Sequence, residues 1–395
     1  MRVGFVVQRC GREVNGGAEL HCLQVAQRMA AHWETEVITT CALDYMTWEN
    51  WYPAGVEKID GTLIRRFPVD HPRDLQKFNQ LSEQLCARRL QVSLSEQEDW
   101  MRAQGPVSTP LLEYLKREKD NYDAFIFFGY LYATTYLGLP IVRDKALLAP
   151  LTHDEWPIHL TMWNDFVRQP RAIIFNSPEE KAFFKKRFPA YERNDPVVGV
   201  GFEEPPVVDR TAFRTKYLLT EPFLLYVGRI DESKGCGELF DWFIQLTENN
   251  PVPHKLVLIG REIMPVPYHP DIVHLGFVSE TDKWNALAAC DWLVNHSTYE
   301  SLSMTVLEGW LAGRPCLVNG KCDVLVGHCK RSNGGLWYQN FNEWAAAILT
   351  VNEVAKATLG LQGNEYVLRN YSWTRIEDTY LRLLGSVESS VQKVN

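Results

Sequence analysis

Short, continuous apolar runs alternate along the chain with stretches whose apolar residues recur at helical spacing. Val3–Val7 is an apolar run typical of a strand buried on both faces, Ala18–Ala31 has helical periodicity, and Glu36–Thr40 returns to the strand pattern. A strand, a loop, a helix and a second strand are the repeating unit of a doubly wound parallel sheet. The pattern therefore predicts an α/β fold.

The same alternation continues, and it restarts after a proline-rich segment at residues 202–208. Before that segment, further strands are predicted at Ala124–Phe128, Ala146–Leu151, Ala172–Phe175 and Val197–Gly201, with a helix at Glu179–Arg187. After it, strands are predicted at Phe223–Val227, Lys255–Ile259, His274–Val278, Asp291–Asn295 and Cys316–Val318, and helices at Gly237–Thr247, Glu280–Ala289, Glu343–Thr350 and Val354–Asn370. We expect domains at 1–205 and 206–370, with a last helix within 371–395.

Residues 70–120 depart from this alternation and predict a charged, helical insertion in the first domain. Its expected helices are Leu75–Leu94, Glu96–Ala103 and Leu111–Lys119. Lys77, Arg88 and Arg89 offer positive charge to a lipid surface or an anionic acceptor. A solvated helical face without a ligand is the alternative reading.

The stretch from Ala124 to Val142 carries no charge and is about as long as a membrane span. Gly129, Gly138 and Pro140 interrupt it, which favours a buried strand followed by a loop and a short helix.

Composition narrows the class of protein. The net charge of −8 argues against nonspecific binding of nucleic acid, so a phosphate ligand would need local cations and backbone N–H groups. The nine cysteines include no Cys-x-x-Cys pair, and the first apolar run is too short for a signal peptide, so a reducing, cytoplasmic compartment is expected. Cys316, Cys322, His328 and Cys329 cluster in sequence, but their spacing fits no zinc pattern.

The stretch from Ser297 to Pro315 combines a polar loop with the start of a helix. Thr305 is the expected N-cap, Glu308 three residues later completes a capping box, and Gly313 and Pro315 end the helix. Loop N–H groups and a helix N-terminus favour an anion. The carboxylates of Glu300 and Glu308 are suited to sugar hydroxyls.

A second polar loop, Gly228–Gly235, follows the predicted strand Phe223–Val227. Gly228 leaves space at the end of the strand, Arg229 offers a planar fork for phosphate oxygens, and Lys234 a compact charge. These two cations can converge on one diphosphate. The alternative is that Arg229 pairs with Asp231 or Glu232.

Two features of the first domain lie where a doubly wound sheet binds ligands. Gly16 and Gly17 follow the first strand and let a loop approach a ligand without a Cβ. His153 follows the strand at Ala146–Leu151. The alternatives are a plain turn before a helix and a structural histidine. Asp154, Glu155 and His159 suggest a metal as a further alternative.

Taken in order, Gly16-Gly17-Ala18-Glu19, His153, the loop Tyr226–Gly235 and the Glu-x7-Glu spacing of Glu300 and Glu308 resemble retaining glycosyltransferases of family 4. The resemblance implies the GT-B fold, in which two Rossmann-like domains face each other across a cleft. It also implies that the last helix crosses back to the first domain. Ser301 and Ser303 depart from the glycines common at these positions.

The resemblance also implies roles for the motif residues. Arg229 and Lys234 would hold the donor diphosphate with N–H groups of Ser303, Met304 and Thr305, Glu300 would bind the transferred sugar, and Glu308 the ribose. Gly16 and Gly17 would close over the phosphates, and His153 would lie near the sugar. The full set implied is catalytic Arg229, Lys234, His153 and Glu300, and donor-binding Gly16, Gly17, Gly228, Val278, Ser301, Leu302, Ser303, Met304, Thr305 and Glu308. Val278 would lie against the base.

The function implied is retaining, metal-independent hexosyl transfer from a UDP- or GDP-sugar to a hydroxyl of a glycan or lipid-linked acceptor, in cell-envelope or exopolysaccharide synthesis. No cofactor and no metal are expected. A cytoplasmic protein is expected, with a peripheral place on the inner face of the membrane as an alternative. A nucleotide-sugar epimerase on the same fold and an inactive nucleotide-sugar-binding protein are the competing functions.

Overall fold

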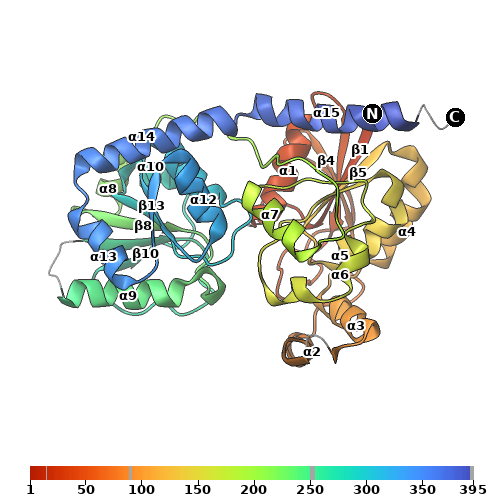
Figure 1. Cartoon of the computed structure of the whole chain (residues 1–395), viewed down its shortest axis with the longest axis horizontal. Helices are drawn as coiled ribbons and strands as arrows, with labels where there is room; N and C mark the ends of the chain where they lie inside the picture. The colour runs from red at the N-terminus through yellow and green to blue at the C-terminus, as the bar shows by residue number, and fades with distance from the viewer. Residues whose placement is uncertain (15, 89–90, 250–253, 392–395) are drawn as a thin grey trace. The chain divides into compact units, whose positions relative to one another are not determined.

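The computed structural model describes residues 1–14, 16–88, 91–249 and 254–391. It divides into two compact units (Figure 1). The first unit comprises Met1–Gly201 and the segment that begins at Trp373, and the second comprises Phe202–Ser372. The boundaries thus fall at 201/202 and 372/373, against expected positions of 205/206 and 370/371.

A seven-stranded sheet forms the centre of the first unit, in the order β3-β4-β2-β1-β5-β6-β7. Its strands are β1 (Arg2–Arg9), β2 (Glu34–Thr40), β3 (Gly55–Ile59), β4 (Thr62–Phe67), β5 (Ala124–Phe128), β6 (Ala146–Ala149) and β7 (Ala172–Ile173). All neighbours run parallel except β3 and β4. The apolar pattern does not predict this edge hairpin, although Asp60 and Gly61 both have positive φ at its two-residue turn.

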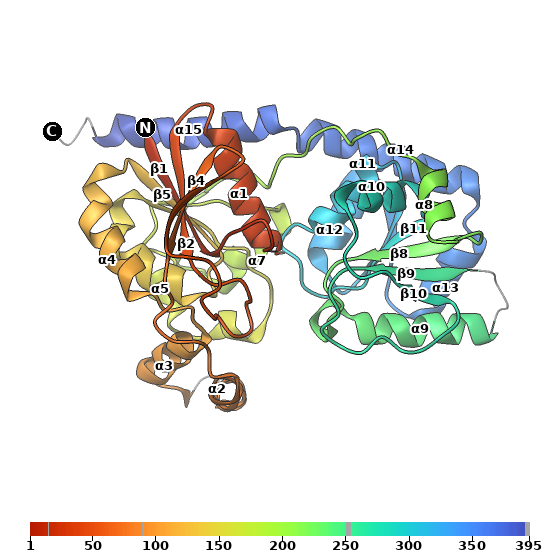
Figure 2. The ribbon, with the colours of Figure 1, turned by 180° about the vertical axis from the view of Figure 1, so that it is seen from behind.

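Helices cover the sheet of the first unit and extend beyond it. They are α1 (Gly17–Met29), α2 (Leu75–Arg88), α3 (Leu94–Gln104), α4 (Thr109–Glu118), α5 (Ala133–Gly138), α6 (Trp163–Phe166), α7 (Pro178–Arg187) and α15 (Trp373–Val391), with 3₁₀ turns at Lys119–Asn121, Leu139–Lys145 and Trp156–His159. Within this unit α2 and α3 project away from the sheet (Figure 2). The C-terminal helix packs on α1, where Arg28 lies over the ring of Trp373 and His32 Nε2 lies 3.2 Å from Glu377 Oε2.

The uncharged stretch after Ala124 is the centre of this unit. Every residue of β5 is buried, and Phe125 and Phe127 pack in one core with Trp163 and Phe184. Burial on both faces explains the continuous apolar run. Within the described ranges, no helix is long and apolar enough to cross a membrane.

The second unit contains a six-stranded parallel sheet in the order β10-β9-β8-β11-β12-β13. Its strands are β8 (Phe223–Val227), β9 (Lys255–Ile259), β10 (Ile272–His274), β11 (Trp292–Asn295), β12 (Cys316–Asn319) and β13 (Gly335–Tyr338). The helices are α8 (Arg210–Lys216), α9 (Cys236–Asn249), α10 (Glu280–Ala289), α11 (Met304–Leu311), α12 (Asp323–Ser332), α13 (Phe341–Thr350) and α14 (Glu353–Asn370), with a 3₁₀ turn at Glu232–Lys234. Trp292 and Trp344 are fully buried in its core.

The two ends of the second unit meet. The Phe202 N–H donates to the Tyr371 carbonyl at 2.8 Å, and Phe202 forms a parallel bridge with Ser372. The first and last residues of the second unit therefore lie next to each other.

Several predicted elements differ from the structure in extent. Val197–Gly201 forms no strand: Val197 makes an isolated bridge with Phe175, and Gly199 has φ +77°. The strand predicted at His274–Val278 ends at His274. The helix predicted at Leu75–Leu94 is described from Leu75 to Arg88, and the helix predicted at Glu96–Ala103 begins earlier, at Leu94, because Ser93 caps it in a capping box with Glu96. Arg89 lies outside the described residues, and Arg88 pairs with Glu96, which fits a solvated face.

Candidate functional site

The carboxyl ends of the strands in the second unit bring several loops into contact. The Gly228 N–H donates to the Ile259 carbonyl at 2.9 Å, and a Cβ on Gly260 would lie 1.9 Å from the Gly228 carbonyl oxygen. A Cβ on Gly235 would lie 2.4 Å from the His296 carbonyl oxygen. Backbones approach this closely only where glycine removes the side chain, so the loops after β8, β9 and β11 form one surface.

The loop between β11 and α11 is held from beneath by buried polar groups. Asn295 Nδ2 donates to Ser303 Oγ at 2.9 Å, and its Oδ1 accepts from the Ser297 N–H. The Leu302 carbonyl accepts from His328 Nε2 at 2.9 Å. Burial lowers the pKa of His328 to about 3, with Arg331 adding to the effect, so the imidazole that holds this loop is neutral.

The prediction of Thr305 as the N-cap of this helix is wrong. The helix begins at Met304, and its N-cap is Ser303, in the left-handed conformation with φ 65° and no side-chain cap. The capping box with Glu308 is also absent, because Glu308 lies beyond the first turn and its carboxylate contacts Lys283 instead. The Glu308 side chain therefore does not cap the helix.

Lys234 and Glu300 meet across two loops. Lys234 Nζ lies 2.9 Å from Glu300 Oε1, and the two side chains are 31% and 15% exposed. Their strands, β8 and β11, are neighbours in the sheet. One cation and one carboxylate are therefore partly buried side by side at the strand ends.

Arg229 forms the ion pair that the sequence offered as the alternative reading. Its Nε lies 2.9 Å from Asp231 Oδ2, and Nη2 donates to Ser233 Oγ at 3.4 Å. Tyr226 fixes the backbone here by donating its hydroxyl to the Arg229 carbonyl at 2.7 Å. Arg229 is thus paired within its own loop in this structure.

Lys283, which the sequence analysis does not single out, contacts the second glutamate of the motif. Lys283 Nζ lies 2.9 Å from Glu308 Oε1 and 2.8 Å from Glu280 Oε1. Its signal in the sequence is a lone cation in the apolar stretch Lys283–Cys290. Finding its partner requires the packing of α10 against α11.

The other residues that the sequence assigns to donor binding lie in the loops before α10 and α11 and in the first turn of α11. Val278 is half-buried in the loop between β10 and α10, and Ser301 precedes the buried Leu302. Met304 and Thr305 form the first turn of α11, where backbone N–H groups have no partner within the helix. Ser303, with its positive φ, sets the direction in which this turn faces.

Gly16 and Gly17 open α1 in the first unit. Gly16 is the N-cap in an extended conformation, and a Cβ there would lie 2.1 Å from Glu19 Oε2, whereas a Cβ on Gly17 would meet nothing within 4 Å. Beneath them, Arg9 Nε lies 2.5 Å from Glu19 Oε1, and both side chains are buried. A Cβ on Gly16 would displace the Glu19 carboxylate, whereas Gly17 leaves open space.

His153 also lies in the first unit, after β6 and thus at the same sheet edge as the loop after β1. The Thr152 N–H before it donates to Glu180 Oε1 at 2.6 Å, and His153 Nδ1 lies 3.6 Å from Glu155 Oε1. Burial raises the pKa of Glu180 to about 7, although its hydrogen bonds to Asn176 and Thr152 oppose the rise.

Glu180 lies in the first turn of α7, but its carboxylate does not complete a capping box. Ser177 does cap α7 and Pro178 does open it, but the Glu180 carboxylate accepts from the Asn176 and Thr152 N–H groups rather than from the N-cap residue. The side chain therefore ties the loop before His153 to α7.

Candidate metal ligands do not assemble in the described ranges. His159 Nε2 lies 2.6 Å from Asp154 Oδ1 as a pair, and no group of three or more His, Cys, Asp or Glu placed to hold a metal ion is found among the residues that the structure describes. Cys316, Cys322 and Cys329 are buried free thiols.

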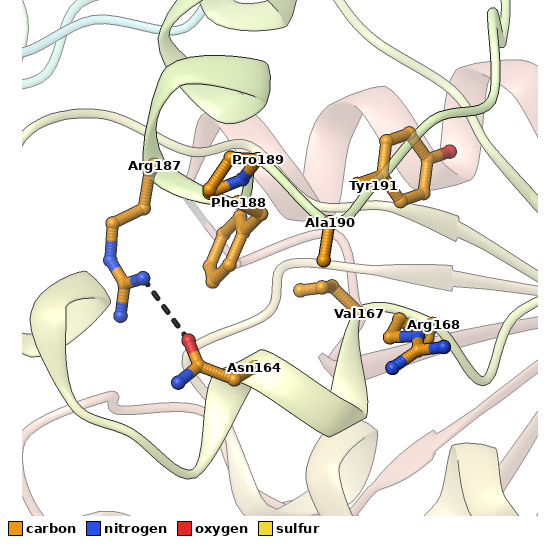
Figure 3. Close-up of a pocket in the computed structure, with 8 residues that line it drawn as sticks. All are labelled: Asn164, Val167, Arg168, Arg187, Phe188, Pro189, Ala190 and Tyr191. Carbon is orange, nitrogen blue, oxygen red and sulfur yellow. Dashed lines mark hydrogen bonds between the residues drawn. The ribbon is translucent and has the colours of Figure 1, made fainter.

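A surface hollow of about 440 Å³ lies elsewhere in the first unit, at the end of α7 (Figure 3). Its lining includes Val167, Phe188 and Tyr191, and Arg187 points toward Asn164 across it. The Arg187 guanidinium also donates to the Ile158 and Leu160 carbonyls. None of the residues named from the sequence lines this hollow, and its arginine is engaged in holding the chain.

Comparison with known proteins identifies a family that resembles the second unit. Residues 221–353, within the second unit, match the family model described as Glycosyl transferases group 1. A comparison with curated proteins finds no match.

Solved structures resemble the chain over nearly its whole length. Sucrose-phosphate synthase from Thermosynechococcus elongatus matches with a TM-score of 0.74 at 16% identity, over 98% of this chain and 99% of that one. HepE from Anabaena, in complex with UDP and glucose, matches with a TM-score of 0.69 at 15% identity, over 98% and 100%. Trehalose-6-phosphate synthase OtsA matches with a TM-score of 0.72 at 13% identity, over 98% and 99%.

The fold is therefore GT-B, with two Rossmann-like domains, as predicted. Within its second unit, residues 221–353 are similar to glycosyl transferases group 1.

Proposed function

We propose that this protein is a retaining glycosyltransferase of family 4, which moves a hexose from a nucleoside-diphosphate sugar to a hydroxyl group of an acceptor. The contact between Lys234 and Glu300 is the observation that carries the proposal. It joins a cation suited to a diphosphate with a carboxylate suited to sugar hydroxyls. One neighbour in fold, HepE, supports it, since HepE was solved in one structure with UDP and glucose and in another with UDP-glucose.

Donor binding would exchange the partners of the ion pairs at the strand ends. Lys234 turns from Glu300 to the diphosphate, which leaves the Glu300 carboxylate to accept hydrogen bonds from the transferred sugar. Arg229 turns likewise from Asp231, and Glu308 accepts from the ribose hydroxyls. Cations fixed beside the diphosphate stabilise the charge that grows on the leaving group.

The transfer needs no protein nucleophile in the front-face mechanism. The bond between the anomeric carbon and the diphosphate oxygen breaks, and the acceptor oxygen bonds to that carbon from the same face. The acceptor proton passes to the departing phosphate oxygen, so the products are the retained glycoside and the nucleoside diphosphate. The N–H groups at the start of α11, near Ser303 and Thr305, are suited to the same phosphate.

Residues of the first unit are also assigned to the donor in this proposal. Gly17 has open space around it, which suits a loop that approaches the donor phosphates. His153 is assigned to the donor sugar, and Val278 of the second unit to the base. We further propose that the acceptor is a glycan or a lipid-linked saccharide of cell-envelope or exopolysaccharide synthesis, and that the enzyme acts in the cytoplasm, without a metal or cofactor, at or near the inner face of the membrane.

A panel of UDP- and GDP-sugars tests the proposal. We expect thermal stabilisation by one of them and slow release of its nucleoside diphosphate, unchanged by a metal chelator. With an acceptor, NMR of the product should show the anomeric configuration of the donor. Binding of a donor with no release of nucleoside diphosphate under any condition, or conversion of the donor into an epimer, would overturn it.

A further inference from the structure

Lys283 and Glu308 form the most buried ion pair at the carboxyl edge of the second sheet among the described residues. Their side chains are 17% and 13% exposed, and Nζ lies 2.9 Å from Oε1. Glu280 is the second partner of Lys283, but it is mostly exposed and lies one turn earlier on the same helix. The contact with Glu308 is therefore the one that joins α10 to α11.

The contact uses only half of the Glu308 carboxylate. Lys283 is bonded to Oε1, and Oε2 has no hydrogen-bond partner among the residues that the structure describes. A carboxylate fixed through one oxygen keeps its other oxygen available in a defined direction. This arrangement suits an acceptor of hydrogen bonds from a ligand.

We propose that Lys283 is a positioning residue for donor binding, which orients the Glu308 carboxylate and keeps it ionised so that it accepts hydrogen bonds from both hydroxyls of the donor ribose. The inference rests on the proposed function, because it takes Glu308 as the residue that binds ribose. Lys283 itself need not touch the donor.

The charges around Glu308 agree with this role. Helix α11 packs against α10, α14, β11 and β12, and its Trp310 also contacts His328 of α12, which burial keeps neutral. Among the described residues that act on the Glu308 carboxyl, Lys283 brings the positive charge and Glu280 the negative one. Burial raises the pKa of Glu308, and Lys283 opposes that rise.

Lys283 is itself suited to remain charged. Burial works to lower its pKa, but the attraction of Glu308 and Glu280 outweighs burial and holds the pKa above its ordinary value. The ammonium group is therefore present throughout the neutral range.

The experiment compares Lys283→Met with the wild type in calorimetric titrations of UDP, GDP and their 2′,3′-dideoxy analogues. In the wild type, the ribonucleotide should bind more tightly than its dideoxy analogue. In Lys283→Met we expect the ribonucleotide to lose about tenfold or more in affinity, because hydrogen bonds to a charged acceptor are the stronger ones. The dideoxy analogue should bind as in the wild type.

A pH profile supplies the readout that loss of packing would not change. In the wild type, the ratio of ribonucleotide to dideoxynucleotide affinity should stay level between about pH 6 and pH 8, because the two ligands carry the same diphosphate and its titration cancels in the ratio. In Lys283→Met this ratio should fall as the pH falls, because an unpaired buried carboxyl takes up a proton in this range. Lys283→Arg should restore the level profile. Lys283→Gln replaces Lys283→Met if the latter does not fold.

Lys356 offers a matched control. It is also buried and bonded to a glutamate three residues earlier, Glu353, at 2.8 Å. Lys356→Met should lower thermal stability without changing the ratio of ribonucleotide to dideoxynucleotide affinity. An unchanged ratio and a level pH profile in Lys283→Met would overturn the role of Lys283. Absence of binding of any nucleotide to the wild type would instead overturn the proposed function.

Discussion

Lys234 and Glu300 lie 2.9 Å apart although 66 residues separate them in sequence. Each side chain neutralises the other in the structure. A phosphate would compete with the carboxylate for the lysine, and a sugar hydroxyl would compete with the lysine for the carboxylate. A nucleotide sugar offers both groups at once, whereas a bare nucleotide would leave Glu300 without its partner.

Removal of either cation of the loop after β8 should weaken the enzyme. Lys234→Ala or Arg229→Ala is expected to lower donor turnover by about 10- to 1,000-fold, from the loss of charge-assisted contacts worth roughly 1.5–4 kcal/mol. The rate at which nucleoside diphosphate is released measures donor turnover. Lys216→Ala is the control, since it breaks a surface ion pair with Asp282 at 2.7 Å. Wild-type rates in both loop variants would refute the assignment to the diphosphate.

Substitutions of Glu300 and Glu308 should differ in which ligand they weaken. Glu300→Gln is expected to weaken binding of the nucleotide sugar by about 10- to 100-fold, yet to leave binding of the bare nucleoside diphosphate equal or tighter, because Lys234 is freed. Glu308→Gln should weaken both ligands by a similar factor. Calorimetric titration of the two ligands measures the difference. The same loss for both ligands in Glu300→Gln would contradict its role in sugar binding.

Acid should destabilise the fold through two buried histidines. Burial lowers the pKa of His21 to about 4 and that of His328 to about 3, from an ordinary value of 6.5. Above pH 6.5 both histidines are neutral in the folded chain and in the unfolded chain. Below it the unfolded chain takes up protons that the folded chain does not, so stability falls by about 1.4 kcal/mol per pH unit for each histidine.

The free energy of unfolding, measured in urea at several pH values between about 7.5 and 5, tests this prediction. In His21→Leu and in His328→Asn, the part of the pH dependence that comes from the replaced histidine should be lost. Each variant is expected to start less stable at neutral pH, but the dependence of its stability on pH should be shallower. A slope equal to that of the wild type in either variant would show that its histidine does not stay neutral.

Gly260 and Gly276 form a matched pair of glycines. Both have positive φ, but a Cβ on Gly260 would lie 1.9 Å from the Gly228 carbonyl oxygen, and a Cβ on Gly276 would meet nothing within 4 Å. Gly276→Ala should cost about 1–2 kcal/mol from backbone strain alone. Gly260→Ala should lower stability by more than this and displace the loop after β8. Its melting temperature and its donor affinity should therefore both be lower than those of Gly276→Ala. Equal melting temperatures would contradict the close approach of the two loops.

The sequence predicted best what a continuous apolar run determines. Ala124–Phe128, Phe223–Val227 and Lys255–Ile259 were each predicted residue for residue, because central parallel strands are buried on both faces and end at polar or glycine residues. Edge elements were harder. The β3 strand is exposed at four of its five positions, so its burial leaves no apolar pattern.

For the candidate site, the sequence identified the loops but not the contacts within them. Lys283 and Glu308 are 25 residues apart, and only the packing of α10 against α11 brings them together. The start of α11 depends on Asn295, which bonds to Ser303 from the end of β11. Local capping rules favoured Thr305 because they contain no such tertiary partner. The roles assigned to the site residues remain predictions.

The bridge between Phe202 and Ser372 has a consequence for evolution. Since the second unit begins and ends at neighbouring positions, it is an insertion into a chain that would otherwise continue from Gly201 to Trp373. An insertion of this kind can be exchanged as a cassette without rerouting the host. Under the proposed function, exchange at this junction would replace the residues assigned to the nucleotide and leave the sequence of the first unit unchanged.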